Sequence, residues 1–591
     1  MPIIKNFIFR ISHQLIILLL LAFGLNINTL FNDYAMDDST AMLDNVLVHK
    51  GIKGIPEIVS HDLFSGDTDV NQSGLSGGRY RPVTLVIFAM EYQFFGKNPM
   101  ADHLINILFF ALLIVLLFKI LHDYIFRDQN KYSAFLTCLL FTVHPIHTEV
   151  IANIKSLDEI LAFILLIASL NALIQHAEKN AVPKLIAGLL FFFLALLTKE
   201  TAVTFIGILP LVLYFFFNRS IKKAILFSIP LVAVFMVYIL LRFSIIGYST
   251  YVKPEIINSP YLFASVSQAF ATKIYVLLKY VSLLFFPHPL SSDYSYNQIP
   301  YINIASFQFI LSILILASLV AYAIYTFKRK SIYSFAIIYF FITIFLFTNF
   351  LINLGAPLAD RFLFQPSLAY CIVIAGIYLH FAEKYKLPAS IILLVILLFF
   401  SVKTISRNAD WKNNETLCLA DVISSPNSVK TNLIAANIYI TKARSESNEG
   451  LKEEYLKKAI KYDEQVLKIY PQYLNSDLYG NLGLAYFLKK DYFKAADNWL
   501  MASRSDSTIS ASTRMLSDIM FKEGIKFHKI GNFDEAVRYY KKSVELNEKN
   551  VEAWYNLGGN YFLLNDIKNG VAAWQNVLIL DPRHPLNKNE F

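Results

Sequence analysis

The segment DHLINILFFALLIVLLFKIL, residues 102–121, decides the fold class of this chain. It opens with a few polar residues, continues through an almost unbroken apolar run, and ends beside one base, Lys119. A helix that crosses the roughly 30 Å hydrocarbon core of a bilayer needs about 20 such residues. The segment therefore predicts a transmembrane helix.

Similar segments recur through the first two thirds of the 591 residues. The same window predicts eleven spans, at 11–30, 102–121, 133–149, 157–176, 184–198, 201–217, 224–243, 306–327, 332–351, 364–382 and 387–404. We expect the first span to remain as an anchor, because no small-residue cleavage site follows it. Residues 1–404 are thus predicted to form a polytopic helical bundle with two large outer loops, 31–100 and 244–305.

The composition excludes several other classes of protein. The chain is 55% hydrophobic, 15% aromatic and 16% charged, against about 25% charged in ordinary soluble domains. A disordered protein, a coiled coil and a purely soluble enzyme are therefore excluded. The net charge of +9 does not indicate nucleic-acid binding, because the bases gather at the ends of apolar runs. The three cysteines, Cys138, Cys371 and Cys418, imply no disulfide framework.

Lys and Arg predict the orientation of the bundle, because they concentrate in short cytoplasmic loops. Bases occur in every second loop, at Lys119, Arg127, Lys131, Lys179, Lys184, Arg219, Lys222, Lys223, Lys328, Arg329, Lys330, Lys384 and Lys386. The N-terminus is therefore predicted to be cytoplasmic, and the residues after about 405 to lie outside the cytoplasm.

One further apolar stretch, 268–286, would invert everything after it if it crossed the membrane. We expect it to be re-entrant or to lie along the outer interface, with its lysines reaching toward water. There it could form one wall of a groove for a lipid.

After a predicted linker, 405–429, the sequence becomes polar and repeats itself. A pattern of apolar residues, Gly and aromatic residues centred on Gly558 has counterparts at Gly524 and Gly483. Gly524 and Gly558 are 34 residues apart. This is the tetratricopeptide period. Residues 430–591 are predicted to form an α-solenoid, a fold that presents a concave face to peptides or partners.

Two adjacent carboxylates, Asp37 and Asp38, follow the first span. They could carry chemistry, or they could be solvated or cap a short helix. Farther along the same loop, Arg79 and Arg81 lie beside Gly78, an arrangement that suits an anion or a lipid headgroup.

More ionisable groups occur at the predicted outer ends of the spans. His144, His147 and Glu149 could hold a metal. Since Pro145 disturbs the helix and no further ligand is near, a polar network lining a cavity is favoured. Further groups of this kind are Asp158, Lys199, Glu200 and Arg361. Because charges are rare in such apolar surroundings, we expect all of them to meet in one water-filled cavity.

Several short motifs occur in a fixed order along the chain. They are Asp37-Asp38, Tyr80-Arg81-Pro82-Val83-Thr84, His103-Leu104-Ile105-Asn106, His144-Pro145-Ile146-His147-Thr148-Glu149, Lys199-Glu200, Asp360-Arg361-Phe362-Leu363-Phe364-Gln365-Pro366-Ser367 and Arg407-Asn408-x-x-Trp411. With the repeats that follow, this order resembles the transmembrane and tetratricopeptide-repeat-containing protein O-mannosyltransferases, within the type-C glycosyltransferases. The chain departs from the animal members in the loop after the seventh span and in its short, diverged repeats, which leaves the acceptor open.

The resemblance implies transfer of one sugar, with mannose favoured, from a polyprenyl phosphate to a protein Ser or Thr outside the cytoplasm, with inversion. The repeats would present the acceptor protein. A carboxylate would deprotonate the hydroxyl; Asp37 and Asp38 are the candidates, and Asp38 is slightly favoured. Arg79, Arg81, Lys199 and Arg361 would bind the donor phosphate. No cofactor is required, although a divalent metal stays an alternative.

The Phe- and Lys-rich, Cys-poor composition favours a bacterial inner membrane with periplasmic repeats, rather than the endoplasmic reticulum and its lumen. Other functions stay open: the same fold could glycosylate a lipid or an envelope glycan, or the helices could only anchor a scaffold of repeats. A transporter is disfavoured, because the membrane part shows no internal duplication.

Overall fold

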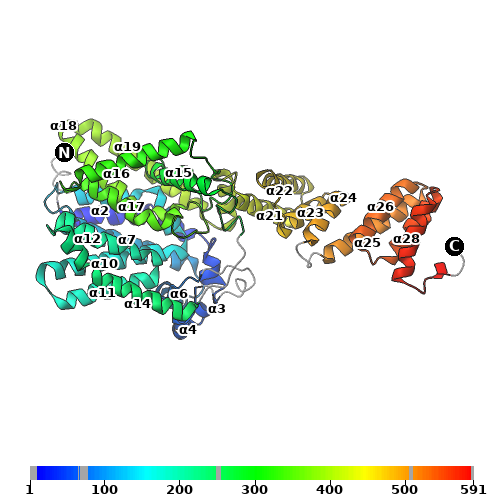
Figure 1. Cartoon of the computed structure of the whole chain (residues 1–591), viewed down its shortest axis with the longest axis horizontal. Helices are drawn as coiled ribbons and strands as arrows, with labels where there is room; N and C mark the ends of the chain where they lie inside the picture. Colours follow the sequence, from blue (N-terminus) through cyan, green and yellow to red (C-terminus); the bar gives the residue numbers. More distant parts are fainter. Residues whose placement is uncertain (1–9, 64, 67–77, 248–254, 505–509, 588–591) are drawn as a thin grey trace. The chain divides into compact units, whose positions relative to one another are not determined.

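A computed structural model describes residues 10–63, 65–66, 78–247, 255–504 and 510–587. Parts of the two predicted outer loops, 64, 67–77 and 248–254, therefore lie outside the described residues. The described chain contains helices and no strand. It divides into two compact units, Met1–Ser425 and Pro426–Phe591 (Figure 1). The predicted class, an all-α membrane bundle with a helical repeat unit, is confirmed.

In the described part of the first unit, eight helical segments are long and apolar enough to cross a bilayer. They are α2–η1 (Ile11–Gly24, Ile27–Phe31), α7–η4 (Pro99–Ile120, Leu121–Ile125), η6–α10 (Ile154–Ser156, Leu157–Lys179), α13–α14 (Ile221–Phe227, Ile229–Ile246), α15 (Val266–Phe285), α16 (Phe307–Phe327), α18 (Ser367–Lys384) and α19 (Lys386–Asp410). A ninth is bent by 55° between α8 (Ser133–Val143) and η5–α9 (Pro145–His147, Thr148–Ala152), because Pro145 cannot continue the hydrogen-bond ladder of α8.

Shorter apolar helices complete the bundle. They are α6 (Pro82–Phe95), α11 (Val182–Thr198), η7–α12 (Glu200–Thr204, Phe205–Phe216) and α17–η8 (Ile332–Ile344, Phe345–Thr348). Each of the eleven predicted segments thus corresponds to an apolar helix. Between α2 and α6 the first loop forms the short helices η2 (Ser39–Leu43), α3 (Val46–His49), η3 (Gly51–Gly54) and α4 (Ile55–Val59).

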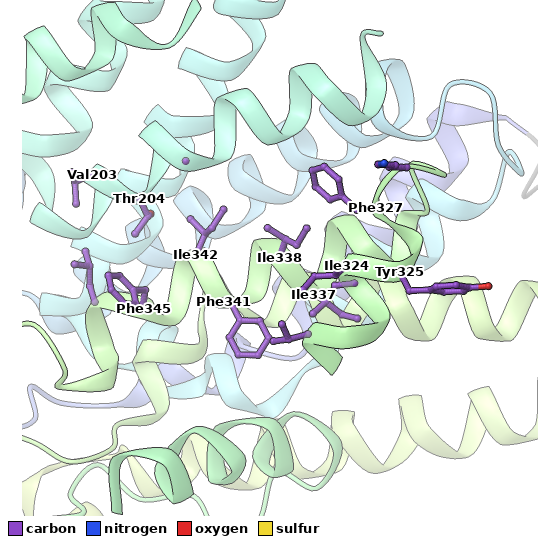
Figure 2. Close-up of a pocket in the computed structure, with 15 residues that line it drawn as sticks. Val203, Thr204, Ile324, Tyr325, Phe327, Ile337, Ile338, Phe341, Ile342 and Phe345 are labelled. Atoms are coloured by element: carbon purple, nitrogen blue, oxygen red, sulfur yellow. The ribbon is translucent and has the colours of Figure 1, made fainter. Parts of the chain in front are cut away.

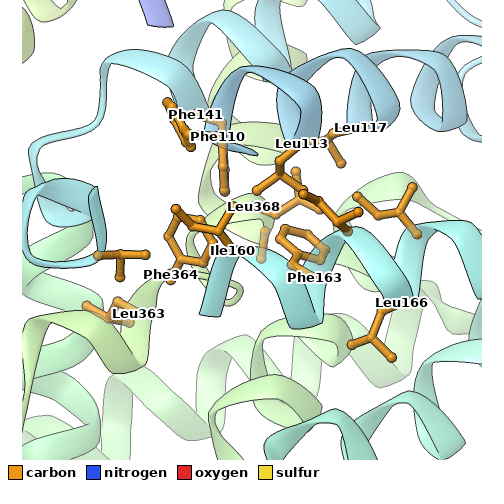
Figure 3. Packing of buried hydrophobic residues seen from close by; sticks show 14 of the residues in the cluster. Phe110, Leu113, Leu117, Phe141, Ile160, Phe163, Leu166, Leu363, Phe364 and Leu368 are labelled. Carbon is orange, nitrogen blue, oxygen red and sulfur yellow. The ribbon is translucent and has the colours of Figure 1, made fainter. Parts of the chain in front are cut away.

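Helix α10 is the most buried of the long helices, whereas α16 and α19 are largely exposed. Figure 3 shows Ile160 and Phe163 of α10 packed among Phe110 of α7, Phe141 of α8 and Phe364, which precedes α18. In lipid, such contacts stabilise the bundle through van der Waals packing, since the surrounding tails are equally apolar. The core therefore fixes the start of α10, where the charged residues lie.

Helix α15 is long and apolar enough to span a bilayer, but its contacts with neighbouring helices do not indicate a crossing. Near its start, the ring of Phe270 lies 6.1 Å from that of Phe309, at the beginning of α16. At its end, the ring of Phe285 lies 5.0 Å from that of Tyr370, at the beginning of α18. Helices α16 and α18 begin at the same end of the bundle, because α17 returns between them. Both ends of α15 thus lie at one end of the bundle, which supports a segment that does not cross.

The described residues of the second unit, 426–504 and 510–587, form four helix pairs: α21–α22 (Val429–Ser445, Glu449–Ile469), α23–α24 (Ser476–Leu488, Tyr492–Ser503), α25–α26 (Ser510–Lys529, Phe533–Leu546) and α27–α28 (Val551–Leu563, Ile567–Leu580). The glycines of the repeat pattern let the two helices of a pair approach. A Cβ on Gly558 would overlap the indole of Trp574, whose Nε1 donates to the carbonyl of Tyr555 at 3.0 Å.

The predicted linker, 405–429, is mostly helical. It contains the end of α19 and helix α20 (Asn414–Ser424), and residues through Ser425 belong to the first unit. The buried Arg407 and Asp421 hold the two helices together through an ion pair of 2.7 Å. Polar composition alone suggested a linker here, because the sequence does not show that these two charges compensate each other in a buried pair.

Candidate active site

The two adjacent aspartates differ in their surroundings. Asp38 is fully buried; its Oδ1 accepts from the backbone N–H of Lys155 at 2.8 Å and its Oδ2 from that of Ala35 at 3.0 Å. Burial raises the pKa of Asp38 to about 7, against the effect of the two N–H donors. Asp37 has a side chain that is 53% exposed and lies 3.8 Å from the ammonium of Lys155.

Asp37 is therefore the carboxylate that solvent reaches, contrary to the preference for Asp38. Asp38 occupies the cap position of η2, but its side chain does not cap that helix. It ties the first loop to the start of α10 instead. Asn106 of α7 supports the same turn, since its amide nitrogen lies 3.3 to 3.5 Å from the carbonyl oxygens of residues 151, 153 and 154.

An ion-pair network joins the first loop to α10 and η7. Arg81 contacts Asp158 at 2.6 Å and Glu200 at 2.8 Å. Lys199 contacts Asp158 at 2.9 Å and Glu159 at 2.7 Å. Although burial opposes its charge, the carboxylates of Glu200 and Asp158 raise the pKa of Arg81. The network brings together four of the residues singled out in the sequence, and Glu159 adds a fifth.

A second pair lies beside this network. The guanidinium of Arg361 binds the carboxylate of Glu149, whose Oε2 also accepts from the backbone N–H of Arg361 at 2.9 Å. The Arg361 side chain is 26% exposed, and it interacts electrostatically with Asp37 and Glu159. Arg79 is exposed and interacts electrostatically with Asp37, Glu200 and Arg361. Both arginines therefore border the same cluster.

The two histidines have protein partners. His144 Nε2 lies 3.0 Å from the carbonyl oxygen of Leu284 in α15, and His147 Nε2 lies 2.8 Å from the hydroxyl of Ser367 in α18. Among the described residues, no group of three or more His, Cys, Asp and Glu side chains is arranged to hold a metal ion. The pair thus fastens the bent span to its neighbours.

Several functional candidates were missed in the sequence. Lys155 links Asp37 to Asp158, with an Nζ–Oδ2 distance of 3.8 Å to each. Asp421 and Tyr294 belong to a neighbouring network with the motif residues Arg407 and Asp360. Arg407 pairs with Asp421 at 2.7 Å, and the hydroxyl of Tyr294 donates to Asp360 at 2.9 Å. Of these residues, Lys155 could have been recognised in the sequence, because it is a lone base between two apolar segments.

A small polar cavity and a large apolar groove adjoin the ion pairs. Glu159, Thr201, Arg361 and Gln365 are among the residues that line the cavity, whose volume of about 10 Å³ matches roughly one water molecule. The groove measures about 900 Å³ and runs between α12, α16 and α17 (Figure 2). Thr204 lines both. No residue of α15 lines the groove, so the prediction that 268–286 forms its wall is wrong for this groove.

The chain is similar to known proteins over most of its length. It is 24% identical to the human Protein O-mannosyl-transferase TMTC3 over 95% of this chain and 67% of that protein. It is 27% identical to the human Protein O-mannosyl-transferase TMTC1, over 77% of this chain and 54% of that protein. It is 25% identical to the Caenorhabditis elegans Protein O-mannosyl-transferase F38B6.6, over 71% of this chain and 58% of that protein. The predicted resemblance is confirmed. The chain spans about two thirds or less of the length of these relatives.

The repeat unit also has matches of its own. A family model described as TPR repeat matches residues 524–565, which cover the end of α25 and all of α26 and α27. Solved structures of MamA and YrrB share 18% identity with this chain over 31% and 35% of its length, and over 94% and 93% of theirs, with TM-scores of 0.17 and 0.16. At such scores these structures add nothing to the fold argument.

Proposed function

We propose that this chain is an integral-membrane glycosyltransferase that moves one sugar, mannose, from a polyprenyl phosphate to a Ser or Thr hydroxyl of a protein. The single observation that carries the proposal is the meeting of three features: an accessible carboxylate at Asp37, the cations around it, and an apolar groove that shares Thr204 with the polar cavity. The named activity of the relatives supports the choice of mannose and of a protein acceptor.

The chemistry follows from these residues. Asp37 accepts the proton of the acceptor hydroxyl while its oxygen attacks the anomeric carbon. The bond from that carbon to the phosphate oxygen breaks, and its electron pair leaves with the phosphate. Arg361, with Arg79 beside it, meets the developing negative charge. Attack from the side opposite the leaving phosphate inverts the configuration of the sugar.

The other charged residues have supporting roles in this proposal. The side chain of Lys199 is only 5% exposed and already contacts two carboxylates, so Lys199 and Arg81 organise Asp158, Glu159 and Glu200 rather than hold phosphate. Asp38 fixes the turn that carries Asp37. Because arginines can meet the charge of a monophosphate, the mechanism requires no metal.

The groove supports a polyprenyl donor. Fifteen residues line it, nearly all apolar, including Ile338, Phe341 and Phe345 of α17 and η8 (Figure 2). An isoprenoid chain would lie there at the depth of the membrane while its phosphate reaches Arg361 past Thr204. A nucleotide-sugar donor has no need of such a groove.

We also propose that the N-terminus is cytoplasmic and that the site and the repeat unit lie on the opposite side, as the basic loops predict. A bacterial inner membrane with a periplasmic repeat unit is the location that composition favours. Ser65→Cys, in the first loop, tests the orientation. Because the three native cysteines are buried, an impermeant thiol reagent should label the introduced cysteine from outside in intact cells. Labelling only after lysis would contradict the proposal.

Sugar transfer itself is tested with the purified full chain in detergent and a panel of radiolabelled polyprenyl-phosphate sugars. We expect label from the mannose donor in the peptide fraction. Asp37→Asn should lower the rate about 10²- to 10⁴-fold, the contribution typical of a general base. Asp44→Asn, an exposed aspartate of the same loop, is the matched control and should leave the rate unchanged.

Three results would contradict parts of the proposal. Full activity of Asp37→Asn would exclude it as the base. Label in the lipid or glycan fraction alone would indicate the alternative acceptor. Full transfer with nucleotide sugars would exclude the polyprenyl donor.

A further inference from the structure

The segment that carries Asp37 is held by the connector that follows the last long helix. We define this connector as residues 411–417, which comprise the three residues between α19 and α20 and the first turn of α20. The N–H of Asp33 donates to the carbonyl of Lys412 at 2.7 Å, and the N–H of Met36 donates to Oδ1 of Asn414 at 2.6 Å. The buried Trp411 packs against Ala35. Residues as far apart in sequence as Met36 and Asn414, 378 positions, therefore fix one short turn.

This turn contains an unfavourable backbone conformation. Met36 has a φ of +55°, in the left-handed region where a Cβ crowds the following carbonyl. Non-glycine residues keep such a conformation only where surrounding contacts hold them there. The connector holds it on one side, and the hydrogen bond between Asp38 and the N–H of Lys155 holds it on the other.

The strained residue immediately precedes Asp37, so its dihedral angles set the direction of the Asp37 side chain. If Met36 relaxed to a right-handed or extended conformation, Asp37 would turn away from Lys155. The hydrogen bond between the Met36 N–H and Asn414 holds the peptide group that precedes the Cα of Met36, next to the φ angle that would change. Asn414 is exposed, so its side chain is not needed to fill a core.

We propose that Asn414 is a positioning residue for Asp37: its side-chain oxygen holds Met36 in the left-handed conformation and thereby aims the Asp37 carboxylate. This inference rests on the proposed function only in that the orientation of Asp37 matters for catalysis. The contact itself lies in the connector, outside the ion-pair network and the groove.

The test compares Asn414→Ala, which removes the acceptor oxygen, with Asn414→Asp, which keeps one. Lys412→Ala is the matched control, because it truncates an exposed neighbouring side chain and leaves the backbone carbonyl that binds Asp33. With the full chain in detergent, Asn414→Ala should lower kcat about three- to tenfold, as for one lost hydrogen bond, at unchanged KM for the donor. Lys412→Ala should leave both constants unchanged.

Two further variants separate positioning from general damage. Met36→Gly should restore kcat in the Asn414→Ala background, because glycine adopts positive φ without cost. Asn414→Asp should keep kcat and shift the acidic limb of the pH profile upward, since an added negative charge near Asp37 disfavours its ionised form. A kcat loss in Asn414→Asp equal to that in Asn414→Ala would overturn the proposal.

A readout that does not depend on sugar transfer completes the design. Hydrogen exchange of the peptide that covers residues 33–38 should accelerate in Asn414→Ala and stay unchanged in Lys412→Ala. Unchanged exchange in Asn414→Ala would overturn the positioning role. A wild-type chain that transfers no sugar from any donor would instead overturn the proposed function, and the exchange result would still decide the role of Asn414.

Discussion

Asp463, in the first helix pair of the repeat unit, makes the stability of that unit depend on pH in an unusual direction. Its side chain is fully buried and both carboxylate oxygens lack a hydrogen-bond partner. Leu456, Ala459 and Val466 share its face of α22 and are also buried. Burial in these apolar surroundings raises the pKa of Asp463 to about 8, from a usual value of 3.8.

The sign and size of the effect follow from proton linkage. Between these two pKa values the folded unit binds a proton that the unfolded chain releases, so the free energy of unfolding falls as pH rises from about 4 to about 8. The rise of the pKa from 3.8 to about 8, at about 1.36 kcal/mol for each pKa unit, gives a ceiling of about 6 kcal/mol. Below the lower value and above the upper one, this carboxyl adds no further slope.

Asp463→Asn removes the titrating group while keeping a polar side chain of the same size. We expect the unfolding free energy of a fragment spanning residues 426–591 to decline between pH 5 and 8 in the wild type. The decline should be much weaker in the variant, so that the variant is the more stable by several kcal/mol at pH 8. Urea denaturation followed by circular dichroism measures both profiles. Parallel profiles from pH 5 to 8 would refute the assignment of the slope to Asp463.

Two further predictions concern packing and the groove. Gly558→Ala should cost about 1–3 kcal/mol of repeat stability, because its Cβ would overlap Trp574. Gly559→Ala is the control, since there is open space around a Cβ at that position, and it should not destabilise the unit. Thermal melting compares the two variants, and equal melting temperatures would contradict the packing. Ile338→Trp, which fills the groove, should raise the KM for a long-chain donor more than for a short-chain one, and the exposed Ile310→Trp should change neither.

The fold was largely predictable because its signals are local. Apolar runs of about 20 residues and a 34-residue period each lie within one continuous stretch, so the helices and the repeats could be located without tertiary information. Helix α15 was harder, because its run looks like a span. Only the alternation of basic loops argued against a crossing, and the contacts of Phe270 and Phe285 agree with that argument.

The difference between Asp37 and Asp38 could not be predicted in the same way. The burial of Asp38 depends on the N–H of Lys155, 117 positions away, and two adjacent carboxylates look alike in a sequence. The ion pair between Arg407 and Asp421 could not be predicted either. It holds α20 against α19 within the predicted linker. Sequence patterns find such polar residues, whereas their partners and exposure come from tertiary contacts.

The charge balance of the site limits which cation can receive a phosphate. Arg81, Lys155, Lys199 and Arg361 each already contact a carboxylate, so an incoming phosphate must share a cation or displace its partner. Lys199 is nearly buried between Asp158 and Glu159, and freeing it would take from the buried Glu159 the cation that it contacts, which is costly. Arg361 is more exposed and contacts Glu149 through one terminal nitrogen, and a guanidinium has five N–H donors. It can therefore bind a second anion without releasing the first.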